Sequence, residues 1–298
     1  MESASRVTSL FPNEVLSRLE RMRVLSSRRF TAKSRGEHLS RRRGTSMEFA
    51  DYRSYVEGDD VRYVDWNAFA RLRRPYLKLF HEEEEMHFLV LVDASGSMAF
   101  DGKLDRAKEL AAAFGVMALL GGERVSLCAM GSSAEGPVRV GGLAGRACIS
   151  SMFRFVEGIA AGGDAPVEAA IEDALRRHRG RGAALVLSDF LTFGDLGRAM
   201  NLLFGSGLEI LGLQVLAPEE IDPELAGDSR LTDSETGERL DVTAGGALVS
   251  LYQEHRAAYE AGLSDGCSRR GGRFVSTGSR DGLEWVIFDL LRRKGWIA

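Results

Sequence analysis

The chain is poor in cysteine and has no cysteine pattern that points to a stapled fold. Its 298 residues include three, Cys128, Cys148 and Cys267, which are odd in number and widely spaced. Disulfide frameworks use an even set of cysteines and zinc sites use close pairs, so neither is indicated. We therefore expect three reduced thiols in a cytoplasmic protein, with Cys128 in a core strand.

Long hydrophobic runs and a strong net charge are also missing. The longest apolar run, Leu110 to Leu120, is far shorter than the roughly twenty residues that span a membrane. The first ten residues are polar and mixed, so we expect no secretory signal and no membrane span. A net charge of −4 gives no overall attraction to nucleic acid, and we predict no nucleic-acid binding.

Motifs of common enzyme classes are absent as well. The sequence has no phosphate-binding P-loop and no Gly-x-Gly-x-x-Gly that opens a helix, and its Gly-x-Ser-x-Gly match at residues 262–266 follows a predicted helix and not the strand that a nucleophile elbow requires. What remains is an ordinary globular composition, 44% hydrophobic and 28% charged, in a length that suits one large or two modest domains. A binding protein is therefore favoured over an enzyme.

The middle and C-terminal parts of the chain alternate between strand and helix patterns. We predict strands over residues 88–93, 124–130, 183–188, 209–216 and 273–277, with a short antiparallel edge at 138–140. We predict helices over residues 104–120, 146–159, 166–177, 195–203, 248–262 and 282–294, and a hairpin inserted near 229–243. This alternation predicts an α/β fold with a mainly parallel sheet covered on both sides.

Polar residues follow one of these strands at its end. The apolar run from Phe88 ends in Asp93, and Ser95 and Ser97 follow at alternate positions around a glycine. Ligands of open α/β sheets bind at the carboxyl ends of the strands. Carboxylate and hydroxyl oxygens suit Mg²⁺ or another hard divalent cation.

Two further acidic loops follow in the chain. A second apolar strand runs from Leu185 and ends in Asp189, and Gly162-Gly163-Asp164 comes before a predicted helix. Each aspartate also has a plainer interpretation. Asp189 and Asp164 could cap helices, and the Asp93 segment could be a turn whose side chains bond the backbone.

The pattern Asp93-x-Ser95-x-Ser97 resembles the metal-ion-dependent adhesion site of von Willebrand factor A domains. The resemblance implies a Rossmann-type, doubly wound fold and a site for Mg²⁺, Mn²⁺ or Ca²⁺, with the ligands Asp93, Ser95, Ser97, Asp164 and Asp189. It also implies one exchangeable position for a carboxylate of a partner protein. The chain departs from the pattern because Asp164 stands where A domains carry threonine. A third carboxylate should tighten cation binding but weaken the capture of an acidic partner.

The first 85 residues have a different composition. An amphipathic helix is predicted over residues 10–25, and the segment from Tyr52 to Arg71 interleaves arginine and aspartate with aromatic residues. We expect a small β-rich extension in which Trp66 is buried, with Asp65 and Arg71 paired or hydrogen-bonded nearby. The predicted domains are therefore 1–85, with the helix and the extension, and 86–298, the A-like domain.

This segment also resembles the family called domain of unknown function 58, or DUF58. An Arg-rich run at Arg41–Arg43, the Gly58-Asp59-Asp60 turn and the block from Asp65 to Arg71 match the family's order. The resemblance implies a bacterial protein that works with a MoxR-type AAA+ ATPase. We therefore predict a non-enzymatic, metal-dependent protein-binding adaptor in protein remodelling or activation, with an unknown client. The alternative is a Mg²⁺-dependent, phosphatase-like hydrolase that uses Asp93, although Ser95 stands where such enzymes carry a second aspartate.

Overall fold

The chain forms two compact units, each described separately below. The computed structural model describes residues 6–26, 31–32, 48–83, 86–131, 138–163, 166–192, 194–223, 228–232, 239–243 and 246–298. The α/β unit consists of residues 1–28 and 86–298, and the small unit consists of residues 29–85. Arg41–Arg43 and Asp164 lie outside the described residues, so the predictions made for them stay predictions.

A six-stranded sheet forms the centre of the α/β unit. In spatial order its strands are β11 (Arg273–Gly278), β8 (Leu208–Leu216), β7 (Gly182–Ser188), β4 (His87–Asp93), β5 (Arg124–Met130) and β6 (Val138–Leu143). Every pairing is parallel except that of β6, which runs antiparallel to β5. The predicted mainly parallel sheet, including its short antiparallel edge, is confirmed.

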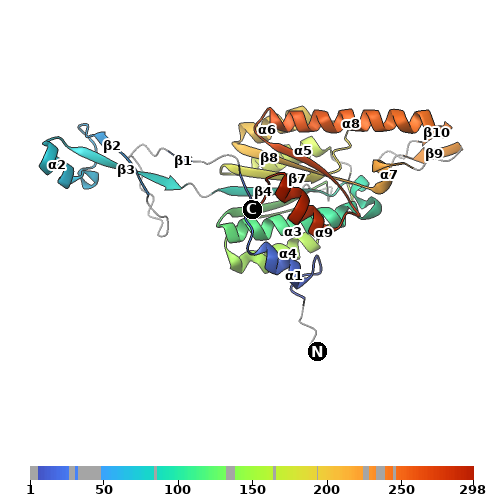
Figure 1. The fold of residues 1–298 in the computed structure, drawn as a ribbon, viewed down its shortest axis with the longest axis horizontal. Helices are drawn as coiled ribbons and strands as arrows, with labels where there is room; N and C mark the ends of the chain where they lie inside the picture. The colour runs from blue at the N-terminus through green and yellow to red at the C-terminus, as the bar shows by residue number, and fades with distance from the viewer. Residues whose placement is uncertain are drawn as a thin grey trace. The chain divides into compact units, whose positions relative to one another are not determined.

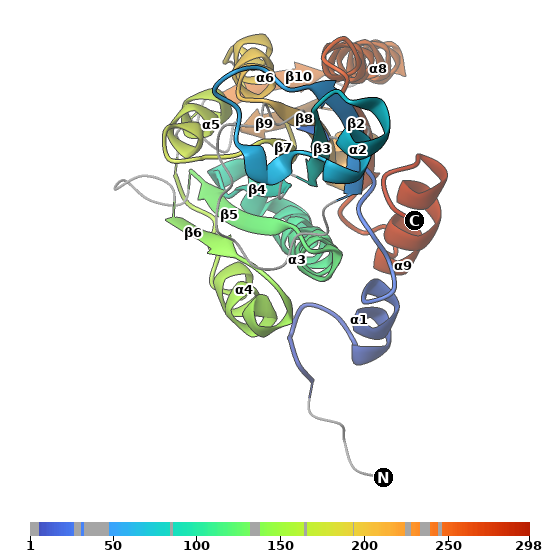
Figure 2. The ribbon, with the colours of Figure 1, turned by 90° about the vertical axis from the view of Figure 1, so that its left-hand side faces the viewer.

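Two groups of helices cover the two faces of this sheet (Figures 1 and 2). One face carries α1 (Asn13–Leu19), α3 (Lys103–Gly121), α4 (Ile149–Glu157), α9 (Leu283–Trp285) and the π-helical turn Val286–Leu291. The other face carries α5 (Val167–Arg176), α6 (Leu196–Gly205) and α8 (Gly246–Ser268). Side chains of β4 alternate between the two cores, because Phe88, Val90 and Val92 pack with the first group and Leu89 and Leu91 with the second.

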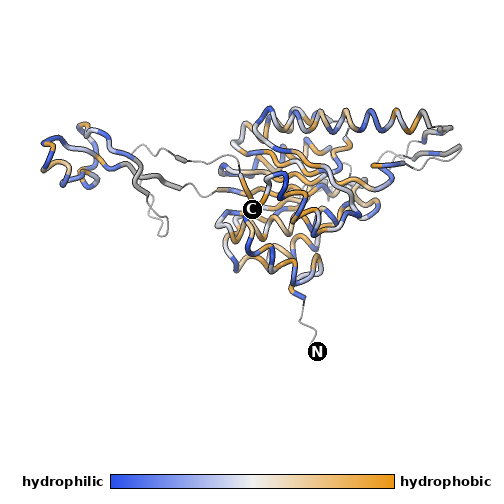
Figure 3. Tube along the Cα trace, viewed as in Figure 1, coloured by the Kyte–Doolittle hydropathy of each residue, from blue (hydrophilic) through white to orange (hydrophobic). Residues whose placement is uncertain are grey.

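Both faces of the central strands are apolar, which explains their continuous hydrophobic runs. Every residue of β7 and β8 is buried, and Figure 3 shows apolar residues concentrated along the sheet. All three cysteines are free, and burial raises the pKa of Cys128 and of Cys267 to about 11. Both thiols are therefore protonated at neutral pH, as expected for core side chains. Within the described ranges, no helix combines the length and the apolar character needed to cross a bilayer.

Residues 6–26 pack on the α/β unit, whereas the sequence prediction grouped them with the extension. Val15 and Leu19 of α1 are buried, and the ring of Phe11 meets that of Phe153 edge-on at 5.9 Å. Val24 forms an antiparallel bridge with Ile297 near the C-terminus. The apolar stripe that predicted this helix is thus buried by its own domain, and the helix is shorter than the predicted range 10–25.

A hairpin interrupts the α/β alternation in the segment where the sequence suggested one. Strands β9 (Asp228–Thr232) and β10 (Arg239–Thr243) pair antiparallel, with Arg239 opposite Thr232. The exposed side chains of Arg230 and Asp241 form an ion pair at 2.6 Å across it. Such an exposed pair contributes little to stability, about 0–1 kcal/mol.

The small unit is β-rich, as the sequence predicted. Strands β1 (Thr31–Ala32), β3 (Tyr76–Glu83) and β2 (Glu48–Ser54) form an antiparallel sheet in that spatial order. A 3₁₀ turn, Val61–Tyr63, and the short helix α2 (Trp66–Leu72) connect β2 to β3. Asp59, in the predicted Gly-Asp-Asp turn, accepts hydrogen bonds from both terminal nitrogens of Arg53.

The prediction that Trp66 is buried is wrong. Its side chain is 61% exposed, whereas the preceding Asp65 is 7% exposed. Asp65 is the N-cap of α2, and its carboxylate accepts the backbone N–H groups of Asn67 and Ala68 at 2.9 and 3.1 Å. Because the cap residue faces the sheet, the next residue begins the helix and points away from it. Trp66 instead contacts the ring of Phe69 edge-on at 6.0 Å.

Asp65 is paired, as predicted, but its ionic partner is Lys78, at 3.2 Å, and not Arg71. The Tyr52 hydroxyl also donates to Asp65, at 2.8 Å. Together the Ala68 amide, the Tyr52 hydroxyl and the Lys78 ammonium lower the pKa of Asp65 from 3.8 to about 2. Asp65 thus joins β2, β3 and α2 through one ionised carboxylate.

We expect Asp65→Asn to destabilise the small unit near neutral pH and to lose this effect in acid. Because the folded-state pKa of Asp65 is lowered, its contribution is complete above about pH 3.8 and disappears as the pH falls through about 2. The melting of the amide signals of residues 66–72, followed by NMR at several pH values, measures it. Glu57→Gln, an exposed carboxylate of the same unit, is the control. A difference between wild type and Asp65→Asn that stays constant down to pH 2 would contradict the prediction.

Backbone hydrogen bonds made by Gly162 and Gly163 hold the loop after α4 against the end of β4. Gly162 N–H donates to Ala94 C=O at 2.8 Å, and Gly96 N–H donates to Gly163 C=O at 3.2 Å. A Cβ atom on Gly163 would lie 1.8 Å from the carbonyl oxygen of Gly131, whereas one on Gly162 would meet nothing within 4 Å. The two glycines have similar φ values, +137° and +150°. Close approach of two backbones therefore requires glycine at position 163 in particular.

Gly163→Ala should consequently lower the melting temperature more than Gly162→Ala. Both changes carry the same kind of backbone strain, but only the first forces two backbones apart. Such overpacking costs about 1–3 kcal/mol of unfolding free energy. Thermal unfolding of the two variants, followed by circular dichroism, measures the difference. Equal melting temperatures would show that this loop does not lie against the end of β5.

Candidate functional site

The candidate site lies at the carboxyl edge of the central sheet. Strands β4 and β7 are neighbours, with Val92 opposite Leu187. Asp93 is the last residue of β4, and Asp189 directly follows β7. Parallel strands end at the same edge, so the two predicted strand-end aspartates are brought together there.

Asp93 is almost fully enclosed, with 2% of its surface exposed. One carboxylate oxygen accepts the backbone N–H of Ser95 at 3.0 Å, and the other accepts the hydroxyl of Ser188 at 2.5 Å. Burial raises the pKa of Asp93, and the hydrogen bonds from Ser188 and Ser95 offset only part of that effect. The negative charge of Asp189 raises the same pKa further. A positive charge placed at this edge would therefore stabilise the ionised form of Asp93.

Ser95 and Ser97 present two hydroxyl groups side by side. Their Oγ atoms are 3.1 Å apart, Ser95 is buried and Ser97 is partly exposed. Both lie where the chain leaves β4 and enters the 3₁₀ segment Gly96–Gly102. Adjacent ligands of an octahedral Mg²⁺ with bonds of about 2.1 Å are themselves about 3 Å apart. The hydroxyl pair therefore has the spacing of two neighbouring ligands of such a cation.

Asp189 is also buried, but its oxygens are engaged within the protein. Oδ2 accepts the ammonium of Lys103 at 2.8 Å, and Oδ1 accepts the backbone N–H of Leu191 at 3.0 Å. Gln214 fixes the backbone of Asp189 by donating to its carbonyl oxygen at 2.8 Å. The following residue, Phe190, has φ of +57°, which turns the chain away from the sheet.

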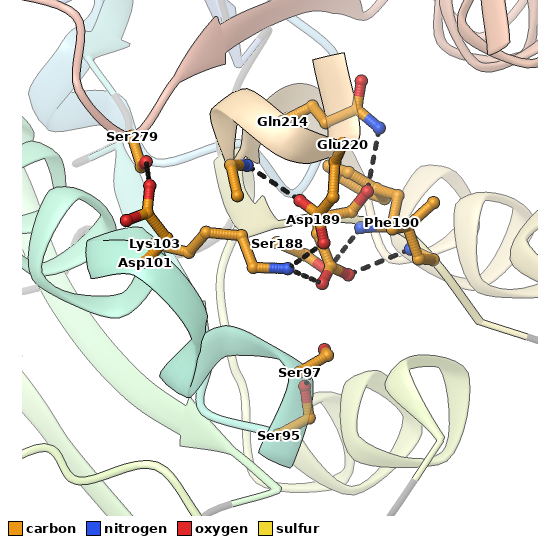
Figure 4. A network of polar contacts seen from close by, with 12 residues as sticks. Ser95, Ser97, Asp101, Lys103, Ser188, Asp189, Phe190, Gln214, Glu220 and Ser279 are labelled. Carbon is orange, nitrogen blue, oxygen red and sulfur yellow. Dashed lines mark hydrogen bonds and ion pairs between the residues drawn. The ribbon is translucent and has the colours of Figure 1, made fainter. Parts of the chain in front are cut away.

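Lys103 is a component of this edge that the sequence analysis did not single out. Its side chain is fully buried, and its ammonium also donates to Glu220 of the short helix α7 (Pro218–Ile221), at 2.6 Å (Figure 4). Burial alone would lower the pKa of Lys103, but the carboxylates of Asp189 and Glu220 outweigh it and raise that pKa. A lysine at the start of a helix is ordinarily solvated, so nothing in the local sequence distinguishes this one.

The structure thus brings together four of the five predicted ligands and describes how they differ. Asp93, Ser95 and Ser97 form one continuous turn, and Asp189 lies across from it in contact with Lys103 (Figure 4). Gly162 and Gly163 contact the turn through their backbone, which places these two glycines at the same edge. Among the described residues, no three His, Cys, Asp or Glu side chains gather as a metal cluster, so a cation here would depend on hydroxyl oxygens.

Comparison with known proteins identifies the relatives of this chain. Residues 51–262 match the family model described as protein of unknown function DUF58. Uncharacterized proteins of Mycobacterium bovis and Mycobacterium tuberculosis are each 30% identical to it over 273 residues, which cover 88% of this chain and 85% of theirs.

Similar solved structures include the conserved hypothetical protein BatB from Bacteroides thetaiotaomicron. It is 15% identical, with a TM-score of 0.43, and the match covers 70% of this chain and 98% of BatB. A von Willebrand factor type A protein from Catenulispora acidiphila is 18% identical, with a TM-score of 0.34, over 59% of this chain and 43% of that protein.

The resemblances noted in the sequence agree with the topology and with the family match. The α/β unit has the von Willebrand factor A-like architecture, a six-stranded, mainly parallel sheet between two layers of helices. The family model covers most of the chain and includes the Asp65–Arg71 block as well as the Asp93 turn. By this match, and by mycobacterial relatives that align over most of their length, the chain belongs to the DUF58 family.

Proposed function

We propose that this protein is a non-enzymatic adaptor that holds a divalent cation at the sheet edge and binds another protein there. The observation that carries the proposal is the pair of Ser95 and Ser97 hydroxyls, 3.1 Å apart beside the buried carboxylate of Asp93. Hard oxygen donors at that spacing suit Mg²⁺, with Mn²⁺ or Ca²⁺ as substitutes. The A-like architecture and the DUF58 membership support an interaction module.

Three residues would hold the cation in this arrangement. Ser95 and Ser97 supply neutral oxygens, and Asp93 supplies the charge, directly or through a water. When bound, the cation supplies a positive centre with an exchangeable position for an acidic side chain of the partner. The hydrogen bonds from Ser95 N–H and Ser188 hold the Asp93 carboxylate in one orientation, so the turn needs little rearrangement to receive the cation.

An adaptor fits this site better than a phosphatase-like hydrolase does. Such a hydrolase would use Asp93 as its nucleophile and a carboxylic acid two residues later as its general acid. The residue two positions on is Ser95, which cannot act as the carboxylic general acid. The hydrolase is therefore the less favoured of the two proposed functions.

The proposed partner is a MoxR-type AAA+ ATPase, together with a client protein. The DUF58 resemblance suggests this association, and a carboxylate on the partner would complete the cation's coordination. The proposed setting is the bacterial cytoplasm. An adaptor of this kind would join the ATPase to the protein that is remodelled or activated.

Mg²⁺ should stabilise chelator-stripped protein against unfolding. A ligand that binds only the folded state adds about 2.7 kcal/mol at a hundredfold excess over its dissociation constant. We expect Asp93→Ala and the double change Ser95→Ala with Ser97→Ala to remove the Mg²⁺-dependent rise in melting temperature. Ser206→Ala, at the end of α6 and away from this edge, should keep it. An unchanged melting temperature of wild type at saturating Mg²⁺ would refute the cation site.

The same double change should weaken the complex with the ATPase. Both hydroxyls lie on the turn after β4, so we expect the variant to stay folded while a pull-down of a purified MoxR-type ATPase falls, as it should for wild type in excess chelator. Equal recovery from all three samples would show that this edge is not the contact. The contact would then lie on the small unit, where Trp66 and Leu72 are exposed, and Trp66→Ala would reduce recovery instead.

A further inference from the structure

A buried ammonium ion stands beside the proposed cation site. The Nζ atom of Lys103 is 2.8 Å from Asp189 Oδ2 and 2.6 Å from Glu220 Oε1, and the lysine side chain has no exposed surface. These three charges come from α3, from the loop after β7 and from α7. A fully desolvated ammonium is tolerated only when carboxylates or carbonyls neutralise it, and here two carboxylates do so.

The contacts of Asp189 leave it poorly placed to serve a second cation. Its Oδ2 is taken by Lys103, and its Oδ1 accepts the Leu191 amide. A divalent cation in direct contact with this carboxylate would stand next to the ammonium, and the two positive charges would repel in a site of low dielectric. Asp93, Ser95 and Ser97 carry no such positive neighbour among their hydrogen-bond partners in the described residues.

We propose that Lys103 is the resident counter-ion of Asp189 and withholds that carboxylate from the divalent-cation site. The inference rests on the proposed cation site and refines it, because the cation is then held by the turn from Asp93 to Ser97. One negative ligand fewer leaves the cation with more residual positive charge. Lys103 thus lowers the affinity of the site for the cation and raises the affinity of the bound cation for an acidic side chain of the partner.

The ammonium of Lys103 also links this edge, through Glu220, to the helices α7 and α8. Glu220 belongs to α7, and its second carboxylate oxygen accepts the Ala217 amide at 2.8 Å. The Tyr252 hydroxyl of α8 donates to the Glu220 carbonyl at 2.6 Å. The position of Asp189 is therefore set from both ends, by Gln214 on its backbone and by Lys103 on its carboxylate.

Replacing the ammonium with an uncharged side chain of similar length tests the proposal. In chelator-stripped protein, Lys103→Met should bind Mg²⁺ at least about tenfold more tightly than wild type, because the competing positive charge is gone and Asp189 becomes available as a ligand. Isothermal titration calorimetry with MgCl₂ measures the affinity. Lys108→Met is the matched control, since Lys108 lies on the same helix and donates to the carbonyls of Glu157 and Ile159 at 2.8 and 3.0 Å. We expect its Mg²⁺ affinity to equal that of wild type.

A second change shows whether the gain passes through Asp189. Adding Asp189→Asn to Lys103→Met should return the Mg²⁺ affinity to the wild-type value and restore part of the stability, because of the three charges only that of Glu220 then remains. Should Lys103→Met unfold in chelator, recovery of its circular dichroism on addition of Mg²⁺ is the expected result. The proposal is overturned if Lys103→Met binds Mg²⁺ no better than wild type, if the gain survives Asp189→Asn, or if Mg²⁺ fails to refold an unfolded Lys103→Met.

These outcomes separate the inference from the proposed function. Wild type that binds no Mg²⁺, together with Lys103→Met that does, would refute the proposed cation site and support the role given to Lys103. Mg²⁺ binding by wild type with no gain in Lys103→Met would keep the cation site and reject the role of Lys103.

Discussion

Two carboxylates are buried at neighbouring strand ends, and the arrangement of the sheet edge follows from the need to neutralise them. Asp93 and Asp189 are 2% and 1% exposed, and the negative charge of Asp189 raises the cost of ionising Asp93. The protein satisfies them differently. Asp93 is held by an amide and a hydroxyl, both neutral donors, whereas Asp189 receives the full charge of Lys103. The charge of Asp93, unlike that of Asp189, is therefore not balanced by a positively charged hydrogen-bond partner.

This asymmetry explains how one edge of the sheet can be both stable and open to a ligand. Lys103, Asp189 and Glu220 form a closed ionic group that joins α3, the loop after β7 and α7. The turn from Asp93 to Ser97 is anchored by backbone hydrogen bonds with Gly162 and Gly163. The hydroxyl groups of Ser95 and Ser97 take no part in this anchoring and contact each other. The proposed cation ligands are thus carried on a rigid edge, an arrangement that favours specific recognition over large rearrangement.

The small unit follows the same principle on a smaller scale. Asp65, whose pKa is lowered to about 2, accepts hydrogen bonds from the first amides of α2 and from a tyrosine hydroxyl, and pairs with a lysine. Because Asp65 is buried against the sheet, the next residue, Trp66, is exposed. A residue that looked like a core anchor in the sequence is therefore available at the surface, where tryptophan is enriched among residues that dominate protein interfaces.

The sequence by itself determined the α/β class, the strands and the turn that carries Asp93, Ser95 and Ser97. These features are local, since a buried parallel strand shows a continuous apolar run and its polar ligands follow directly in the chain. Tertiary structure alone decided which charge each aspartate meets. Lys103 is separated from Asp189 by 86 residues and from Glu220 by 117, and no local pattern records a contact between side chains so far apart. Tertiary structure also decided that Asp65 faces inward and Trp66 outward, because adjacent residues at a helix start differ in direction and only packing chooses between them.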